Sequence, residues 1–390
     1  MKESKKRMLI TAPDSMIRAF LKPHIEALIN DGWEIYIACS DYIGGGDTLR
    51  NIFNENIKFY TVGLARSPFK VCRNLKGLRE VKAIVDSGNY DVIWTHGPVM
   101  SVVTRIAARE ARRKGSKVWY LAHGFHFFSG APLINWILYY PIEYIMSGYV
   151  DMLMTINEED YTRALKFKAR NVRKIHGIGL DVKKFIDHIL SVDFYKKLRK
   201  SIGISDDDVM ILSVGELKIH KNQKVIIKAI AKCDLNNVHY VVCGKGPDKT
   251  KLELLASSLN IRQKVHFLGF RKDIADLCRV ADIFVHPSVR EGLGIAPLEA
   301  MASGLPLISS TVGGIKDYAH DGETGFCLSP YDVDGFAKAL MILISDKSLR
   351  RTFGEHNAKV AMRYDIKCAK TVILSTAREL LNEKLGKVNQ

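Results

Sequence analysis

Residues 286–314 read HPSVREGLGIAPLEAMASGLPLISSTVGG. The apolar run that leads into them predicts a buried strand, which Pro287 stops. A loop with Gly292 and Gly294 follows, and Pro297 suits the first turn of a helix, because the N–H that proline lacks has no partner there. A helix start offers backbone N–H groups and the positive end of its dipole to a phosphate. The stretch therefore predicts a phosphate-binding turn between a strand and a helix.

Two carboxylates flank this turn. Glu291 lies in the loop and Glu299 in the following helix, with seven residues between them. Carboxylates beside a phosphate repel the ligand unless they bind its hydroxyl groups. A nucleotide sugar has phosphates in the middle and hydroxyls on both sides, so it fits this arrangement. The alternative for Glu299 is a glutamate that only favours the helix dipole.

Short apolar runs alternate with helical patterns along the chain, which is typical of parallel sheets covered on both faces. Residues 181–208 carry no strong strand pattern and divide the runs into two sets. The 390 residues also exceed the about 250 to 300 at which one core stops growing. We therefore expect an α/β fold of two Rossmann-like, doubly wound domains with ligands at the C-terminal ends of the strands. The predicted strands are 8–13, 33–40, 57–63, 91–97, 117–124, 152–157 and 173–179, then 209–215, 238–244, 264–270, 282–286 and 305–309.

The stretch from Glu291 to Glu299 resembles the Glu-x7-Glu region of the retaining glycosyltransferases of family four, including the small-residue helix, strand and Val-Gly-Gly turn that follow. Those enzymes have the GT-B fold, so the resemblance implies two Rossmann-like domains that face each other across a cleft. It also implies that Glu291 contacts the transferred sugar and that Glu299 binds the ribose of the donor nucleotide. The backbone of the turn would hold the diphosphate, at Gly292, Gly294 and Ile295.

The same resemblance gives each domain a role. Residues 1–183 would form the acceptor-binding domain, and residues 184–363 would form the domain that binds the nucleotide sugar. In this family the last helix often crosses back to the first domain, which we expect of residues 364–390.

A second loop carries the predicted cations. Residues 211–223 read ILSVGELKIHKNQ, a strand, a loop and a helix start. Family members hold the donor diphosphate with a cation after the Val-Gly and a lysine before the helix; Lys221 matches the second, next to the backbone of Gly215. Glu216 replaces the usual arginine, and Lys218 either substitutes for it or is a surface lysine. Because the leaving diphosphate gains negative charge, fixed cations and N–H groups stabilise it, and we expect no metal or other cofactor.

The predicted strand that ends at Gly269 points to the base of the donor. In the family, backbone groups just past this glycine read the base. The resemblance would place uracil near Phe270 and Arg271, so the expected donor is a UDP-sugar.

Two histidines follow the predicted strand at 117–124. Residues 121–130 read LAHGFHFFSG. Family members have a histidine here that contacts the donor sugar, and His123 matches it. His126 lies among phenylalanines, where a hydrogen-bonded core histidine is the more common case.

The next segment, residues 131–146, reads APLINWILYYPIEYIM. It fits either a buried helix or a segment at a lipid interface, where aromatic rings and lysines collect. Together with the histidine motif it resembles enzymes of bacterial capsule and exopolysaccharide assembly, which act on sugars linked through diphosphate to undecaprenol. The net charge of +16, with dense basic clusters at 2–7, 109–114 and 166–174, fits such an anionic acceptor and an anionic membrane surface.

The expected location is the cytoplasm, with peripheral association at the inner face of the cell membrane. The seven cysteines form no Cys-x-x-Cys pair and are typical of reduced core residues. Asp14 and Arg18 interrupt the first apolar segment too early for a signal peptide. Charges and Pro141 break the longest apolar tract, so we expect no transmembrane helix.

These observations predict a retaining transferase that moves a hexose or N-acetylhexosamine from a UDP-sugar to a lipid-linked saccharide. A non-hydrolysing UDP-sugar epimerase of the same architecture is one alternative, and a basic nucleic-acid-binding protein is another. Nucleic acid is not an expected partner, since basic and aromatic residues do not alternate on one platform. A nicotinamide oxidoreductase would carry Gly-x-Gly-x-x-Gly at residues 11–20, which read TAPDSMIRAF.

Overall fold

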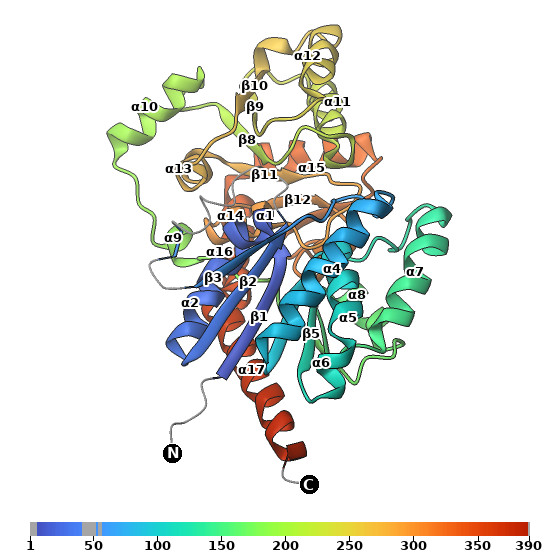
Figure 1. Cartoon of the computed structure of the whole chain (residues 1–390). Coiled ribbons are helices and arrows are strands. Elements are labelled where there is room, and N and C mark those ends of the chain that lie inside the picture. The colour runs from blue at the N-terminus through green and yellow to red at the C-terminus, as the bar shows by residue number, and fades with distance from the viewer. Residues whose placement is uncertain (1–5, 41–51, 54–56, 389–390) are drawn as a thin grey trace. The chain divides into compact units, whose positions relative to one another are not determined.

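The structure is a computed structural model that describes residues 6–40, 52–53 and 57–388. Part of the predicted basic cluster at 2–7, residues 2–5, lies outside these ranges. The chain folds into two compact units (Figure 1). Unit 1 runs to Gly179 and resumes at Ile366, and unit 2 is Leu180–Asp365.

The described residues of unit 1 form a parallel sheet of seven strands in the order β3-β2-β1-β4-β5-β6-β7. β1 lies between β2 and β4, so Met8 pairs with Ile35 on one side and Val92 on the other. Every side chain of β4 and β5 is buried, as expected for strands covered on both faces. The strands are β1 (Lys6–Pro13), β2 (Trp33–Ser40), β3 (Lys58–Val62), β4 (Val92–His96), β5 (Lys117–Ala122), β6 (Met152–Thr155) and β7 (Asn171–Lys174).

Helices connect these strands. α7 (Leu133–Ser147) runs through Pro141 without ending, although Pro141 breaks the apolar tract in the sequence. The other helices of unit 1 are α1 (Asp14–Met16), η1 (Ile17–Leu21), α2 (Lys22–Asn30), α4 (Val71–Gly88), α5 (Pro98–Ala107), α6 (Arg109–Arg113) and α8 (Glu158–Ala164), with α17 (Ile366–Val388) at the C-terminal end.

The C-terminal helix α17 packs against α2, β4 and β5. The buried Nζ of Lys117 lies 3.1 Å from Oε2 of Glu383 on this helix. Gly179 lets the chain approach α17 closely, because it has φ +91° and an added Cβ would lie 2.8 Å from Cα of Ile366. The last helix is therefore part of the packing of unit 1.

The described residues of unit 2 form a parallel sheet of six strands in the order β10-β9-β8-β11-β12-β13. The strands are β8 (Val209–Val214), β9 (Val238–Cys243), β10 (Val265–Gly269), β11 (Ile283–His286), β12 (Leu307–Ser310) and β13 (Gly325–Leu328). The helices are α9 (Lys183–Ile186), α10 (Val192–Ile202), η2 (Ile219–Lys221), α11 (Gln223–Cys233), α12 (Lys249–Ser258), η3 (Arg262–Lys264), α13 (Ile274–Val280), α14 (Ile295–Ala302), η4 (Gly313–Asp317), α15 (Val333–Ser345), α16 (Lys347–Ala361) and η5 (Met362–Tyr364).

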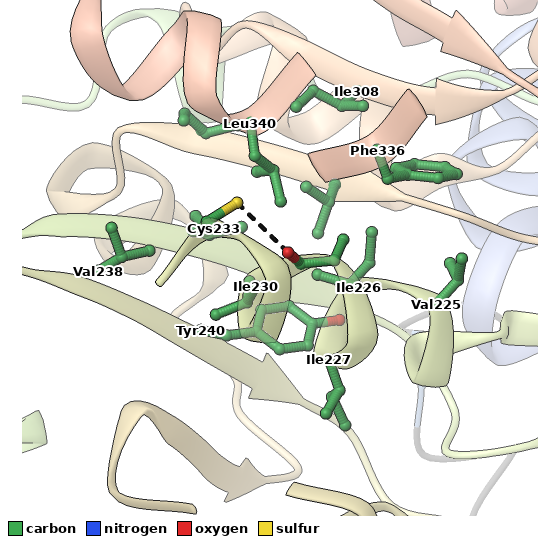
Figure 2. Packing of buried hydrophobic residues seen from close by; sticks show 14 of the residues in the cluster. Val225, Ile226, Ile227, Ile230, Cys233, Val238, Tyr240, Ile308, Phe336 and Leu340 are labelled. Carbon is green, nitrogen blue, oxygen red and sulfur yellow. Dashed lines mark hydrogen bonds between the residues drawn. The ribbon is translucent and has the colours of Figure 1, made fainter. Parts of the chain in front are cut away.

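Figure 2 shows the core of unit 2, where α11 and α15 pack on the sheet. Ile226 and Ile230 of α11 belong to the same buried cluster as Phe336 and Leu340 of α15. The thiol of Cys233 donates a hydrogen bond of 3.3 Å to the carbonyl of Ala229, the dashed line in Figure 2. The seven cysteines, all of which lie in the described ranges, form no disulfide with one another.

The predicted α/β class with two doubly wound parallel sheets is confirmed. Two local details differ from the prediction. β13 was not expected, and the predicted strand 173–179 is β7 at Asn171–Lys174. The segment 181–208, which showed no strong strand pattern, contains α9 and α10. β13 is only Gly-Phe-Cys-Leu, which is too short to show a periodic pattern against its turn-rich surroundings.

Candidate active site

The turn after β11 has the predicted strand-loop-helix form. α14 starts at Ile295, so Pro297 lies in its first turn, as predicted. Gly294 occupies the N-cap with φ +83°, and an added Cβ would lie 3.1 Å from both Cγ of Glu291 and the hydroxyl of Tyr318. Glycine is therefore needed here for the backbone conformation and for space.

Three side chains donate to one carboxylate oxygen of Glu291, Oε2. Lys221 Nζ lies at 2.5 Å, His286 Nε2 at 3.0 Å and Ser288 Oγ at 3.3 Å. Within the described residues, Oε1 of Glu291 has no such partner. The carboxylate is thus fixed through one oxygen, and the other can still accept hydrogen bonds.

The electrostatics of this cluster favour an ionised Glu291. Burial opposes ionisation, but the hydrogen bond from His286 and the charge of Lys221 outweigh burial and hold the pKa of Glu291 well below its usual range. Burial also lowers the pKa of His286. The imidazole is therefore neutral near pH 7 and donates through its Nε2–H. Lys221 is then the cation that balances the carboxylate.

The loop after β12 closes on the backbone of Glu291. Gly313 has φ +49°, and an added Cβ would lie 2.0 Å from the carbonyl oxygen of Glu291. The N–H of Gly314 points to the same oxygen at 3.4 Å. The Val-Gly-Gly sequence therefore serves close backbone packing around the carboxylate.

Lys221 is held in place by the residues around it. Asn222 adopts a left-handed conformation, φ 58°, and its side-chain amide donates to the carbonyls of Pro287 and Pro330 at 3.1 and 2.6 Å. The stem of Lys221 passes over Gly215, where an added Cβ would lie 3.7 Å from its Cδ. Lys218 differs from Lys221, since it is half exposed and pairs with Glu216 at 2.7 Å.

Glu299 lies in α14 in a largely buried position. Burial raises its pKa to about 7, against an opposing influence of Lys184. Within the described residues its carboxylate accepts no hydrogen bond. Its backbone carbonyl accepts hydrogen bonds from Ser303. A carboxylate in such a place gains most from a ligand that donates hydrogen bonds to it.

The two residues predicted near the base follow β10. Gly269 turns the chain with φ +69°, and Phe270 then exposes 66% of its surface. Arg271 is in a two-point contact with Asp273, at 2.8 and 2.5 Å. The exposed ring of Phe270 is therefore available for stacking, and the guanidinium is already paired.

In unit 1, His123 lies at the end of β5 beside a histidine that the sequence analysis did not single out. His96 Nδ1 is 3.1 Å from His123 Nε2. Burial lowers the pKa of His123 to about 4, with a further lowering from His24, and burial also lowers the pKa of His96. Both rings are thus neutral near pH 7. A His-Gly pair at the end of each strand, 96–97 and 123–124, was the available sequence signal.

His126 has a different environment from His123. Its ring lies 4.7 Å from that of Tyr139, and its backbone carbonyl accepts a hydrogen bond from Asn135. These contacts tie the loop after β5 to α7.

Two family models match the chain. Residues 194–360 match glycosyl transferases group 1, and residues 12–157 match the glycosyl transferase 4-like family. EpsD of Bacillus subtilis (strain 168) is named a glycosyltransferase. It is 37% identical to this chain over 365 residues, which are 93% of each chain. The chain belongs to the group 1 glycosyltransferases.

One further relative and one solved structure resemble this glycosyltransferase over most of its length. The UDP-Gal:alpha-D-GlcNAc-diphosphoundecaprenol alpha-1,3-galactosyltransferase of Escherichia coli is 26% identical over 331 residues, 83% of each chain. The crystal structure of Anabaena HepE in complex with UDP and glucose aligns with a TM-score of 0.78 and 20% identity, covering 96% of this chain and all of the other. The fold of this glycosyltransferase is therefore GT-B.

Membership of this family decides against the epimerase and the nucleic-acid-binding protein as the class of this chain. Among the described helices, none has the length and apolar character that crossing a bilayer requires. The predicted contacts of the individual residues with donor and acceptor stay predictions.

Proposed function

We propose that this glycosyltransferase is a retaining, metal-independent enzyme that transfers a hexose or N-acetylhexosamine from a UDP-sugar to a saccharide on undecaprenyl diphosphate. The product would serve capsule or exopolysaccharide synthesis. The observation that carries the proposal is the Glu291 carboxylate, fixed by Lys221, His286 and Ser288 beside the start of α14.

The donor diphosphate would bind where α14 begins. The first N–H groups of a helix have no partner inside it, so Gly294 and Ile295 at the start of α14 can present backbone N–H groups to phosphate oxygens. Gly292 precedes them in the same turn. The ammonium group of Lys221, next to Gly215, supplies the fixed positive charge. Lys218 is a second candidate cation, and it would have to leave Glu216 to reach the diphosphate.

The two glutamates would bind the sugars on either side. Oε1 of Glu291 can accept a hydrogen bond from a hydroxyl of the transferred sugar, because Oε2 is already saturated. Glu299 can accept from the ribose hydroxyls, which would replace the hydration that burial removes. Phe270 can stack on uracil, with Arg271 beside it.

The proposed reaction proceeds on one face of the sugar. The bond between the anomeric carbon and the diphosphate oxygen breaks, and Lys221 and the N–H groups stabilise the charge that develops on the leaving UDP. The acceptor hydroxyl forms the new bond on the same face and gives its proton to that diphosphate oxygen. Glu291 and His123 act by positioning the sugar, and a neutral His123 fits this role.

The names of the similar proteins support a UDP-sugar as donor and a lipid-linked saccharide as acceptor. One relative's name contains UDP-Gal and a diphosphoundecaprenol acceptor, and one structural neighbour holds UDP and glucose. The net charge of +16 suits an anionic acceptor and peripheral binding to the inner face of the cell membrane.

A transfer assay tests this proposal. The enzyme is incubated with UDP-hexoses and UDP-N-acetylhexosamines and with undecaprenyl-diphosphate saccharides, and the anomeric configuration of the product is read by NMR. We expect the configuration of the donor to be kept and Glu291→Gln to lower turnover about 10²- to 10³-fold. The exposed Glu323 gives the matched control, Glu323→Gln, with unchanged turnover. An inverted product, or full activity of Glu291→Gln, would overturn the proposal.

A further inference from the structure

Unit 1 contains a groove of about 480 Å³, which is within the range of about 300 to 1,000 Å³ typical of small-molecule sites. We call it the α5–α7 groove. Its lining includes Val102 of α5, Phe127 and Phe69, together with Leu138 and Ile142 of α7. Most of its lining is therefore apolar.

The elements that line the groove also carry exposed apolar side chains. On α7, Leu133, Ile134 and Ile137 are all more than half exposed, and Ile137 exposes 60% of its surface. Phe69, which lines the groove, exposes 72%, and Val71 of α4 is also more than half exposed. Apolar side chains gathered in this way mark a surface that meets an apolar partner. Figure 1 shows α4, α5 and α7, the helices that contribute to it.

The charges of the groove favour an anionic group at its rim. At its inner end, Glu143 is neutralised by the fully buried Arg105, at 2.9 Å. Arg66 lines the rim and is exposed. Within the described part of the chain, its guanidinium makes no hydrogen bond or ion pair. The groove thus combines an apolar interior with one unbalanced positive charge.

The loop that carries Arg66 is fixed by Asn74 of α4. The N–H of Ala65 donates to Oδ1 of Asn74 at 3.0 Å, and Nδ2 of Asn74 donates to the carbonyl of Ser67 at 3.0 Å. One side chain therefore holds the backbone on both sides of Arg66. This arrangement lowers the entropy that the arginine loses when it binds a ligand.

We propose that the α5–α7 groove binds the isoprenoid segment next to the diphosphate of the acceptor lipid, with Arg66 on the diphosphate. The inference rests on the proposed function, which supplies an acceptor that is apolar at one end and doubly charged at the other. The exposed residues of α7 and α4 would then rest on the membrane from which this lipid rises.

Calorimetry with farnesyl diphosphate tests the groove directly, because this probe carries the isoprenoid segment and the diphosphate but needs no membrane. Excess UDP is present to occupy the donor site. We expect the full chain to bind farnesyl diphosphate and to bind inorganic pyrophosphate or farnesol about tenfold or more weakly, since each lacks one half of the contacts. Equal affinity for pyrophosphate alone would overturn the proposal.

Matched variants separate the groove from the rest of unit 1. Val102→Trp fills the groove and Leu138→Glu puts a negative charge on its exposed wall, and each should weaken farnesyl diphosphate binding about tenfold or more. Ile106→Trp is the control on α5 outside the groove. Arg66→Ala should also weaken binding about tenfold, whereas Arg113→Ala on α6 should not. Leu138 is partly exposed, so its variant keeps the test valid if Val102→Trp does not fold.

The outcomes distinguish this inference from the proposed function. One outcome is that transfer from a UDP-sugar occurs while the groove variants bind farnesyl diphosphate as well as the wild type does. In that case the proposed role of the groove is wrong and the proposed function stands. If the groove variants lose binding but no UDP-sugar is transferred, the groove stands and the function is wrong. Binding only to vesicles of anionic phospholipid, with none to farnesyl diphosphate, would make this face a membrane contact and overturn the proposal.

Discussion

At the residue scale, the charge of Lys221 has two roles, and one substitution can remove that charge without a general loss of stability. It balances Glu291 and is the proposed cation for the donor diphosphate. Lys221→Met keeps the apolar stem over Gly215 but removes the charge, and we expect turnover to fall about 10²- to 10³-fold. Lys224→Ala, at an exposed position of α11, is the control. Steady-state kinetics with a thermal melt of each variant would check this, and unchanged turnover in Lys221→Met would contradict it.

Glu299 gives a prediction about pH. Its pKa is raised by burial to about 7, and only the ionised form can accept two ribose hydrogen bonds. UDP affinity should therefore rise about tenfold between pH 6 and pH 8. Glu299→Gln should bind UDP more weakly at pH 8 and lose this pH dependence. Calorimetry at both pH values would show it, and a parallel pH dependence in the variant would refute the role of Glu299.

The same raised pKa affects stability in the opposite direction. The ordinary pKa of a glutamate is 4.5, and in the folded protein the pKa of Glu299 is about 7. Between these two pH values the folded protein holds more protons at Glu299 than the unfolded chain does. The contribution of this group is therefore present at low pH and is lost as the pH rises through about 7. Urea unfolding of the wild type and Glu299→Gln between pH 5 and 8 should show the difference.

The residues of the site differ in how far the sequence predicts them. Glu291 and Lys221 matched a family motif, and the structure brings their side chains together in unit 2. His286 and Ser288 complete the same cluster but were not predicted, because their role depends on the direction in which short side chains leave the turn. His96 was missed although both His-Gly pairs are visible in the sequence, because only the pairing of β4 with β5 brings the ends of these two strands together.

At the element scale, the start of α14 depends on Gly294. Gly294→Ala should destabilise the protein by about 1 to 3 kcal/mol, because a non-glycine residue is strained at this backbone conformation, and should lower turnover, because the new Cβ would press on Glu291. Gly322→Ala is a matched control, with φ +75° and open space around an added Cβ. It should lose similar stability and keep its activity. Equal turnover of the two variants would contradict the coupling between Gly294 and Glu291.

The helix α17 gives an element-scale prediction about stability. Lys117 is only 2% exposed and pairs with Glu383 of α17. Glu383→Gln leaves that charge buried without its carboxylate, so we expect a loss of about 2 kcal/mol. Glu379→Gln breaks the half-exposed pair with Arg173 and should cost less than about 1 kcal/mol. Urea unfolding would rank the two variants, and an equal loss would contradict the account.

The elements themselves were predictable to different degrees. Continuous apolar runs identified the central strands, because a strand buried on both faces carries apolar residues at every position. α10 was not predicted, because its Ser191 cap was not recognised. The start of α14 was predictable, because Pro297 lies in its first turn and Gly294 is its N-cap.

At the scale of the whole molecule, two parallel sheets are confirmed, and the family of the chain is that of group 1 glycosyltransferases. The sequence predicted the fold because the strand-helix pattern repeats along the whole chain, and it predicted the family because one motif is specific enough to identify it. The donor sugar and the linkage depend on a few hydroxyl contacts, which side-chain positions alone decide.

The central claim is that the UDP diphosphate binds at the start of α14, between Lys221 and the two glutamates. A crystal structure of the enzyme with UDP tests it most directly. We predict that a diphosphate oxygen lies within hydrogen-bonding distance of the Ile295 N–H and of Nζ of Lys221, with the ribose at Glu299. A UDP molecule bound away from α14, with Glu299 still without a partner, would contradict the account.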